Sequence, residues 1–253
     1  AKSGHPGMPL GAAPIGYSIF TNMTFNNKDT SFDNRDRFVL SAGHASMLDY
    51  SLYYLFGFGL KKEDIMNFRQ LGAKTAGHPE YGVCPGVETS TGPLGQGIAN
   101  AVGMAIAEDY LATKFNKEGF PIVDHYTYAL CGDGCMQEGI ENEAASLAGS
   151  LKLGKLIVLY DDNDITIEGD TNITFNENVG KRHEAQGWQV IHVDDANDLV
   201  AIRKAIKKAK KEQNKPSLII LKSIIGYGSP LAGSHECHGA PLGAENLQKM
   251  KDD

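Results

Sequence analysis

Features that define whole classes of protein are scarce in this sequence. Its 253 residues include only four cysteines, with no C-x-x-C pair and no evenly spaced framework; they are Cys84, Cys131, Cys135 and Cys237. A disulfide-stapled secreted scaffold is therefore not expected, and reduced thiols in a cytoplasmic protein fit better. Cys131, Cys135 and the HECH segment at 235–238 suggest zinc, but no second cysteine pair completes four soft ligands.

Long apolar runs and an excess of positive charge are also missing. No stretch approaches the roughly 20 apolar residues of a membrane span, and no signal sequence opens the chain. The net charge of -7 argues against a nucleic acid or an anionic membrane as partner, since either would favour a basic surface. We expect a soluble cytoplasmic protein with a small-molecule substrate. Because the first residue is Ala1, we also expect preceding sequence to be trimmed or processed away.

The chain shows no repeat, low-complexity tract or linker. With 42% hydrophobic residues it can bury a sizeable core, so we expect residues 1–253 to form a single domain. Short β-rich apolar runs at 126–131, 155–161, 188–193 and 217–223 alternate with segments suited to helices. This alternation predicts an α/β fold, a parallel sheet with helices on both faces.

Two helices can be predicted in more detail. The segment 197–213 has an apolar face at helical spacing, with Asn197 or Asp198 as the N-cap. We interpret its lysine-rich side as a solvated polar face rather than an anion site. The segment 98–111 is apolar nearly all round, which predicts a buried helix, plausible at a subunit interface.

A Gly-Asp-Gly segment at 132–134 follows an apolar strand and precedes a helix. In an open parallel sheet, ligands bind at the carboxyl ends of the strands, where helix N-termini point free N–H groups outward. Glycines there let the backbone approach a bulky anion, while Asp133 offers a hard carboxylate oxygen. Alone, such a segment is more often an ordinary turn.

The residues at the end of the next strand favour a ligand site over an ordinary turn at 132–134. That strand brings the Asn163 side chain and the backbone carbonyl of Ile165 to the same edge of the sheet. A carboxylate, an amide oxygen and a carbonyl suit Mg²⁺ or Ca²⁺, with room for diphosphate oxygens and water. Since only Asp133 is charged, the ligand's own phosphates would have to help hold the metal.

Gly-Asp-Gly followed by an asparagine at the end of the next strand resembles the thiamin diphosphate motif. Other segments narrow the resemblance to the transketolase family, whose order they keep: SGHPGMPLG at 3–11, LSAGHAS at 40–46, GHPE at 77–80, ETSTGPLGQGIANAVGMAIAE at 88–108, GDGCMQEG at 132–139 and GSHECHGAPLG at 233–243. Together they run the length of the chain and resemble the N-terminal, diphosphate-binding domain of that family.

The resemblance implies a cofactor site for thiamin diphosphate. It implies that Asp133, Asn163 and the Ile165 carbonyl bind Mg²⁺ or Ca²⁺, while Gly134 and His44 contact the diphosphate.

It also implies the surroundings of the reacting groups. Gly92 and Leu94 would lie beside the pyrimidine ring of the cofactor, and His238 would reach both the diphosphate and the substrate channel. His5 and His78 resemble the substrate-side histidines of the family.

The family's pyrimidine-binding and C-terminal domains have no counterpart in this sequence. Glu138 resembles the residue that touches the activating glutamate of the pyrimidine domain across a dimer. We therefore expect the chain to anchor metal and diphosphate without completing an active site alone. It would need a pyrimidine-domain subunit, as in a split transketolase, or the remainder of a longer enzyme, in a homodimer or a heterotetramer.

The implied reaction is transfer of a two-carbon ketol unit from a ketose to an aldose. Whether these sugars are phosphorylated is not fixed by the residues present. Two alternatives stay open: a non-catalytic module that binds thiamin diphosphate for assembly or regulation, and a related thiamin diphosphate enzyme with another sugar donor.

Some residues have a structural interpretation as well. A histidine in a Gly- or Pro-rich loop usually just hydrogen-bonds to backbone, although four such histidines in matching loops favour a site. His125, His183 and His192 match no motif and are interpreted as structural. Asp49 stands where similar sequences usually have an apolar residue, so we expect unusual packing there.

Overall fold

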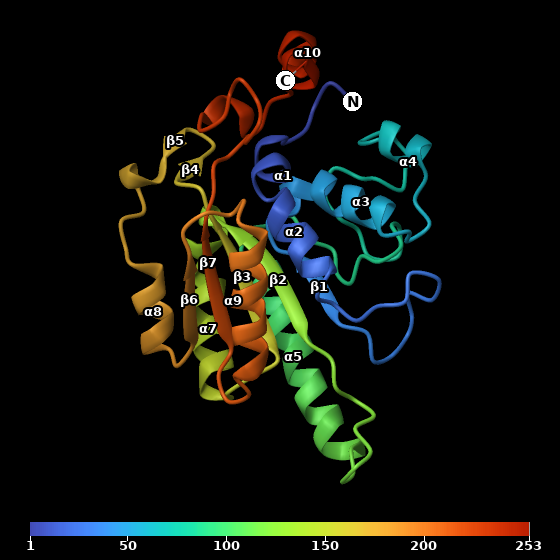
Figure 1. Cartoon of the computed structure of the whole chain (residues 1–253), viewed down its shortest axis with the longest axis vertical. Coiled ribbons are helices and arrows are strands. Elements are labelled where there is room, and N and C mark those ends of the chain that lie inside the picture. The colour runs from blue at the N-terminus through green and yellow to red at the C-terminus, as the bar shows by residue number, and fades with distance from the viewer. Residues whose placement is uncertain (253) are drawn as a thin grey trace.

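A five-stranded parallel sheet forms the centre of the computed structural model, which describes residues 1–252 (Figure 1). Its strands lie in the order β1-β2-β3-β7-β6. Their bounds are Arg37–Leu40 for β1, Thr127–Gly132 for β2, Leu156–Asp162 for β3, Gln189–Val193 for β6 and Ser217–Lys222 for β7. A separate antiparallel pair, β4 (Ile165–Thr166) and β5 (Gly169–Asp170), follows β3.

Helices cover both faces of this sheet. They are α1 (Gly7–Gly11), α2 (Ala13–Phe20), α3 (Ser46–Leu55), α4 (Lys62–Met66), α5 (Gln96–Phe115), α6 (Asp133–Met136), α7 (Gly139–Ser150), α8 (Val179–Ala185), α9 (Leu199–Lys211) and α10 (Gly243–Asp252). Helices α5 and α7 pack together on one face, and α9 and α2 lie on the other (Figure 1). The predicted α/β class, with helices on both faces, is confirmed.

The core lies around the inner strands. Every residue of β2 except Gly132 is buried, and β3 and β7 are buried except at their last residue. Strands buried on both sides need such continuous apolar runs, which is why the sequence pattern found them. Strand β1 was not predicted, because its four residues are too few to show a pattern.

The two predicted helices behave differently. Asp198 caps α9, where its carboxylate accepts hydrogen bonds from the N–H groups of Val200 and Ala201. Helix α5 is buried only on the face that packs against the sheet; farther along, Tyr110 is 61% exposed. Within this single chain the helix is thus only partly buried, and burial of its other face at a subunit interface stays a prediction.

Long-range contacts bring distant loops to the carboxyl ends of the strands. The Gly226 N–H, in the loop after β7, donates to the carbonyl of Gly7 at 2.8 Å. This bond ties the N-terminal loop to the C-terminal one.

All four cysteines are buried and unbridged. Within residues 1–252, no helix is both long and apolar enough to cross a membrane.

Asp49 lies inside the core as part of α3. It is 2% exposed, and its Oδ1 atom has no hydrogen-bond partner. Burial raises the pKa of this carboxyl well above its ordinary value, because the charged form is poorly solvated there. The unusual packing expected at this position takes the form of a carboxyl among apolar neighbours.

We expect Asp49→Leu to raise the free energy of unfolding by about 1–3 kcal/mol at neutral pH, because it removes an unpaired polar group of similar shape. The pKa of the Asp49 carboxyl is higher in the folded chain than in the unfolded chain, where it is about 3.9. Asp49 therefore destabilises the folded chain only above about pH 3.9, and the stability gained by Asp49→Leu should shrink as the pH falls towards that value. Urea denaturation at neutral and acid pH measures both effects. Asp109→Leu, at an exposed position of α5, is the control; an equal gain there, or a gain independent of pH, would contradict the prediction.

Candidate functional site

A cavity of about 430 Å³ opens at the carboxyl ends of β2 and β3. Every site residue predicted from the sequence lines it: His5, His44, His78, Gly92, Leu94, Asp133, Gly134, Glu138, Asn163, Ile165 and His238. The walls also include residues that sequence reasoning did not select, among them Met8, Ile225 and the segment 166–168, which runs from the last residue of β4 into the turn before β5. Residues from nearly the whole chain length therefore meet at one place.

Two neighbouring strand ends form the floor of the cavity. Gly132 at the end of β2 pairs with Asp161 in β3, so the next residues of both strands emerge side by side. Asp133 begins α6, and its Oδ2 accepts a hydrogen bond from the backbone N–H of Asn163 at 3.3 Å. The predicted metal ligands Asp133 and Asn163 are thus adjacent.

Residues of β3 and the loop after β7 fix the orientation of these groups. The Tyr160 hydroxyl donates to Oδ1 of Asp133. Asp161 accepts from the Asn163 amide nitrogen at 2.8 Å and from the Ser223 hydroxyl. The Asn163 amide oxygen accepts from the Ile165 N–H at 3.0 Å and keeps a second lone pair.

Sequence reasoning missed Tyr160, Asp161 and Ser223. The available signal was the run YDDN at 160–163, where polar groups interrupt an otherwise apolar strand.

The charge at this floor suits a divalent cation. Burial raises the pKa of Asp133 to about 7; the Tyr160 hydrogen bond opposes that rise, while the carboxylates of Asp162 and Asp161 add to it. A bound cation would hold the carboxylate ionised. The donors are hard oxygens of the kind that Mg²⁺ and Ca²⁺ prefer. Across residues 1–252, no group of three or more His, Cys, Asp or Glu side chains is placed to hold a metal ion.

Three histidines from distant loops form the opposite wall. The ring centroids of His5 and His44 are 5.0 Å apart, those of His5 and His238 are 5.8 Å apart, and His44 stacks on His238 at 5.2 Å. The Nδ1 atoms of His5 and His238 are buried and have no partner within the chain. Buried polar atoms of this kind normally have a partner, so the wall offers hydrogen-bonding groups to a ligand.

The fourth histidine lies by a glycine-rich loop. A Cβ atom on Gly92 would come within 3.4 Å of the His78 ring. In the same loop, Gly95 has a φ of +78°, and a Cβ there would lie 2.8 Å from Cβ of Glu138. Close packing of this loop against the 132–138 turn therefore requires glycine at position 95.

The buried histidines are held in their neutral form. The pKa of His5 is lowered to about 4 and that of His44 to about 3; burial is the larger cause in both cases, and the neighbouring His238 contributes to each shift. At neutral pH each ring then offers one N–H donor and one lone pair. They can donate and accept hydrogen bonds without carrying charge.

We expect the His5 and His44 rings to stay neutral down to about pH 5, against about 6.5 for a free histidine. Between about pH 6.5 and pH 4, His5 and His44 bind protons in the unfolded chain but not in the folded chain. The free energy of unfolding should therefore fall as the pH drops through this range. NMR titration of the imidazole signals measures this, with His5→Asn and His44→Asn to assign them. Midpoints near the free value for both rings would contradict it.

Comparison with known proteins gives a consistent result over the whole chain. The family described as "Transketolase, thiamine diphosphate binding domain" matches residues 1–253. A transketolase of Geobacillus stearothermophilus is 56% identical over 254 residues, covering 100% of this chain and 38% of that protein. Transketolase 1 of Saccharomyces cerevisiae is 56% identical over 252 residues, covering 99% of this chain and 37% of that protein.

Solved structures agree. A crystal structure of transketolase from Pichia stipitis in complex with sedoheptulose 7-phosphate has a TM-score of 0.98 and 52% identity, covering 99% of this chain and 37% of that one. A transketolase from Leishmania mexicana has a TM-score of 0.98 and 50% identity, covering 99% of this chain and 38% of that one. This chain spans little more than a third of the length of these relatives. It belongs to the transketolase family and corresponds to the thiamine diphosphate binding domain of that family.

Proposed function

We propose that residues 1–253 act as a single domain that holds the diphosphate and metal of thiamin diphosphate in a cytoplasmic transketolase. The reaction is transfer of a two-carbon ketol unit from a ketose phosphate to an aldose phosphate. The observation that carries the proposal is the position of Asp133 beside Asn163, at the floor of a cavity walled by neutral histidines.

The floor of the cavity holds the charged part of the cofactor. Asp133, Asn163 and the Ile165 carbonyl would hold Mg²⁺, or Ca²⁺ in its place, through hard oxygens. Gly134 and His44 would contact the diphosphate. Because the chain supplies one charged ligand, metal and diphosphate bind together rather than separately.

The walls serve the reacting groups. Thiamin diphosphate, when bound, supplies carbanion stabilisation for cleavage of a carbon–carbon bond beside a carbonyl. Gly92 and Leu94 lie beside the pyrimidine, and His238 contacts the diphosphate and faces the substrate channel. His5 and His78 donate hydrogen bonds to sugar hydroxyls or the carbonyl and shuttle protons, which their neutral rings allow.

Activity also requires parts outside this chain. Glu138 is exposed at the edge of the 132–138 turn, where it can contact the activating glutamate of a pyrimidine-binding domain. That domain comes from a second subunit or from the remainder of the same polypeptide, in a homodimer or a heterotetramer. A solved relative in complex with sedoheptulose 7-phosphate supports a phosphorylated sugar as substrate.

We expect Asp133→Ala to abolish metal-dependent binding of thiamin diphosphate, because it removes the one charged side chain among the proposed metal ligands. Calorimetry of the complete enzyme with Mg²⁺ and thiamin diphosphate measures the loss. The control is Asp194→Ala, which removes an exposed carboxylate at the carboxyl end of β6 in the same sheet. Unchanged affinity in Asp133→Ala would remove the metal assignment.

We expect His78→Ala to slow turnover by about 100-fold or more while weakening cofactor binding far less, because general acid–base groups contribute on that order. The assay is ketol transfer from xylulose 5-phosphate to ribose 5-phosphate, with the pyrimidine-domain partner present. If His78→Ala leaves turnover unchanged, His78 has a structural role and not an acid–base role. If the unaltered enzyme binds cofactor yet never transfers a ketol unit with any partner, a non-catalytic module is favoured instead.

A further inference from the structure

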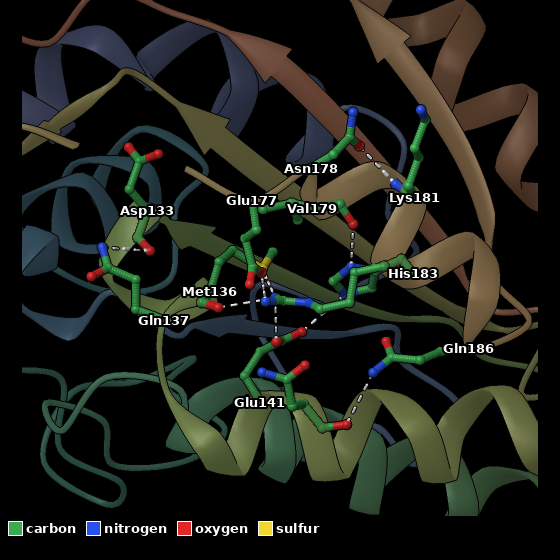
Figure 2. A network of polar contacts seen from close by, with 12 residues as sticks. Asp133, Met136, Gln137, Glu141, Glu177, Asn178, Val179, Lys181, His183 and Gln186 are labelled. Carbon is green, nitrogen blue, oxygen red and sulfur yellow. Dashed lines mark hydrogen bonds and ion pairs between the residues drawn. The ribbon is translucent and has the colours of Figure 1, made fainter. Parts of the chain in front are cut away.

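A buried charged cluster joins α8 to α7 and to the turn that carries the metal ligand (Figure 2). It consists of Glu141 in α7 and Arg182 and His183 in α8. Glu141 and His183 are each only 1% exposed. In Figure 2, Glu141 points between Met136 and His183, close to the turn that begins at Asp133.

Both ring nitrogens of His183 face hydrogen-bond acceptors. Nδ1 lies 2.9 Å from the carbonyl oxygen of Val179, and Nε2 lies 2.9 Å from Oε1 of Glu141. Arg182 donates to the other oxygen of the Glu141 carboxyl, Oε2, at 2.8 Å. The ring of His183 therefore cannot turn without losing a contact within α8 or to α7.

The Arg182 guanidinium pairs with two carboxylates. One belongs to Glu141, which is 1% exposed, and the other to Glu177, which is 45% exposed. Removing one member leaves a buried charge without its partner. This loss destabilises the folded chain by far more than an exposed ion pair stabilises it. The cluster therefore fixes α8 and α7 in one arrangement.

Arg182 extends this arrangement to the metal-binding turn. Its Nη2 atom donates to the backbone carbonyl of Met136 at 2.9 Å. Met136 ends α6, a single helical turn of four residues, and such a turn is unstable alone and leaves its last carbonyls without helical partners. Asp133 begins that same turn, so the Arg182 bond fixes the far end of the element that presents the metal ligand.

We propose that Glu141, Arg182 and His183 are positioning residues that hold α6 with Asp133 and Gly134 facing the metal and diphosphate. His183, which matched no motif, thereby gains a role through Arg182 and Glu141 rather than by touching the ligand. This inference rests on the proposed function, because it concerns the same cofactor site.

The test compares two variants of the complete enzyme. Arg182→Gln removes the donor to Met136 and keeps the Glu141–His183 pair, whereas Glu141→Ala removes the common partner. We expect each to weaken the joint affinity for Mg²⁺ and thiamin diphosphate about tenfold or more, as loss of an outer support of a metal ligand does. Calorimetry measures the affinity, and thermal unfolding of the same variants measures their stability.

Glu141→Gln adds a rescue. Its amide oxygen can accept from Arg182 and its amide nitrogen can donate to the His183 ring, so affinity should recover most of the loss seen in Glu141→Ala. Glu184→Gln, exposed on α8, should leave affinity unchanged. Ile202→Ala, fully buried in α9 on the other face of the sheet, should lower thermal stability without lowering affinity.

The outcomes separate the two proposals. If the unaltered enzyme binds no metal and cofactor, the proposed function fails and this inference fails with it. If it binds them and Arg182→Gln binds equally well, only the positioning role is overturned. The role is also overturned if Ile202→Ala loses as much affinity at a similar loss of stability, or if Glu141→Gln recovers none of the affinity that Glu141→Ala loses. Should Glu141→Ala not fold, Arg182→Gln decides.

Discussion

The hydrogen bond from the Asn163 N–H to the Asp133 carboxylate is the contact on which the site depends. It exists because β2 and β3 are neighbours in a parallel sheet and end at the same level, so the residues after both strands meet. Parallel pairing needs the whole helical crossover of α6 and α7 between the strands. The crossover that makes the sheet therefore also delivers the turn on which Asp133 stands.

Much of this could be predicted from sequence, for a definite reason. Strands buried on both faces appear as unbroken apolar runs, and the end of each run located Asp133 and Asn163 to the residue. The loops of His5, His44, His78 and His238 have no periodicity that could place them in space. Their convergence on one cavity was predicted by resemblance to a family, and the structure brings those loops together.

What the sequence did not predict lies one layer away from the cavity. Tyr160 and Asp161 sit within a strand, where a polar residue has no local pattern that reveals its partner. Glu141 and His183 are 42 positions apart, and only the packing of α8 on α7 brings them together. Supporting contacts of this kind depend on tertiary structure, which local sequence patterns do not reveal. The same holds for how many residues of α5 remain exposed.

The wall formed by His5 and His238 has a consequence for synthesis on the ribosome. Their rings lie 5.8 Å apart although the residues come from opposite ends of the chain. The floor formed by Asp133 and Asn163 can assemble once β3 has emerged and paired with β2. The wall can form only after the loop that follows β7 has been synthesised, because the contact between His5 and His238 spans nearly the whole sequence. A nascent chain can thus bring Asp133 and Asn163 together before the rest of the cavity has formed around them.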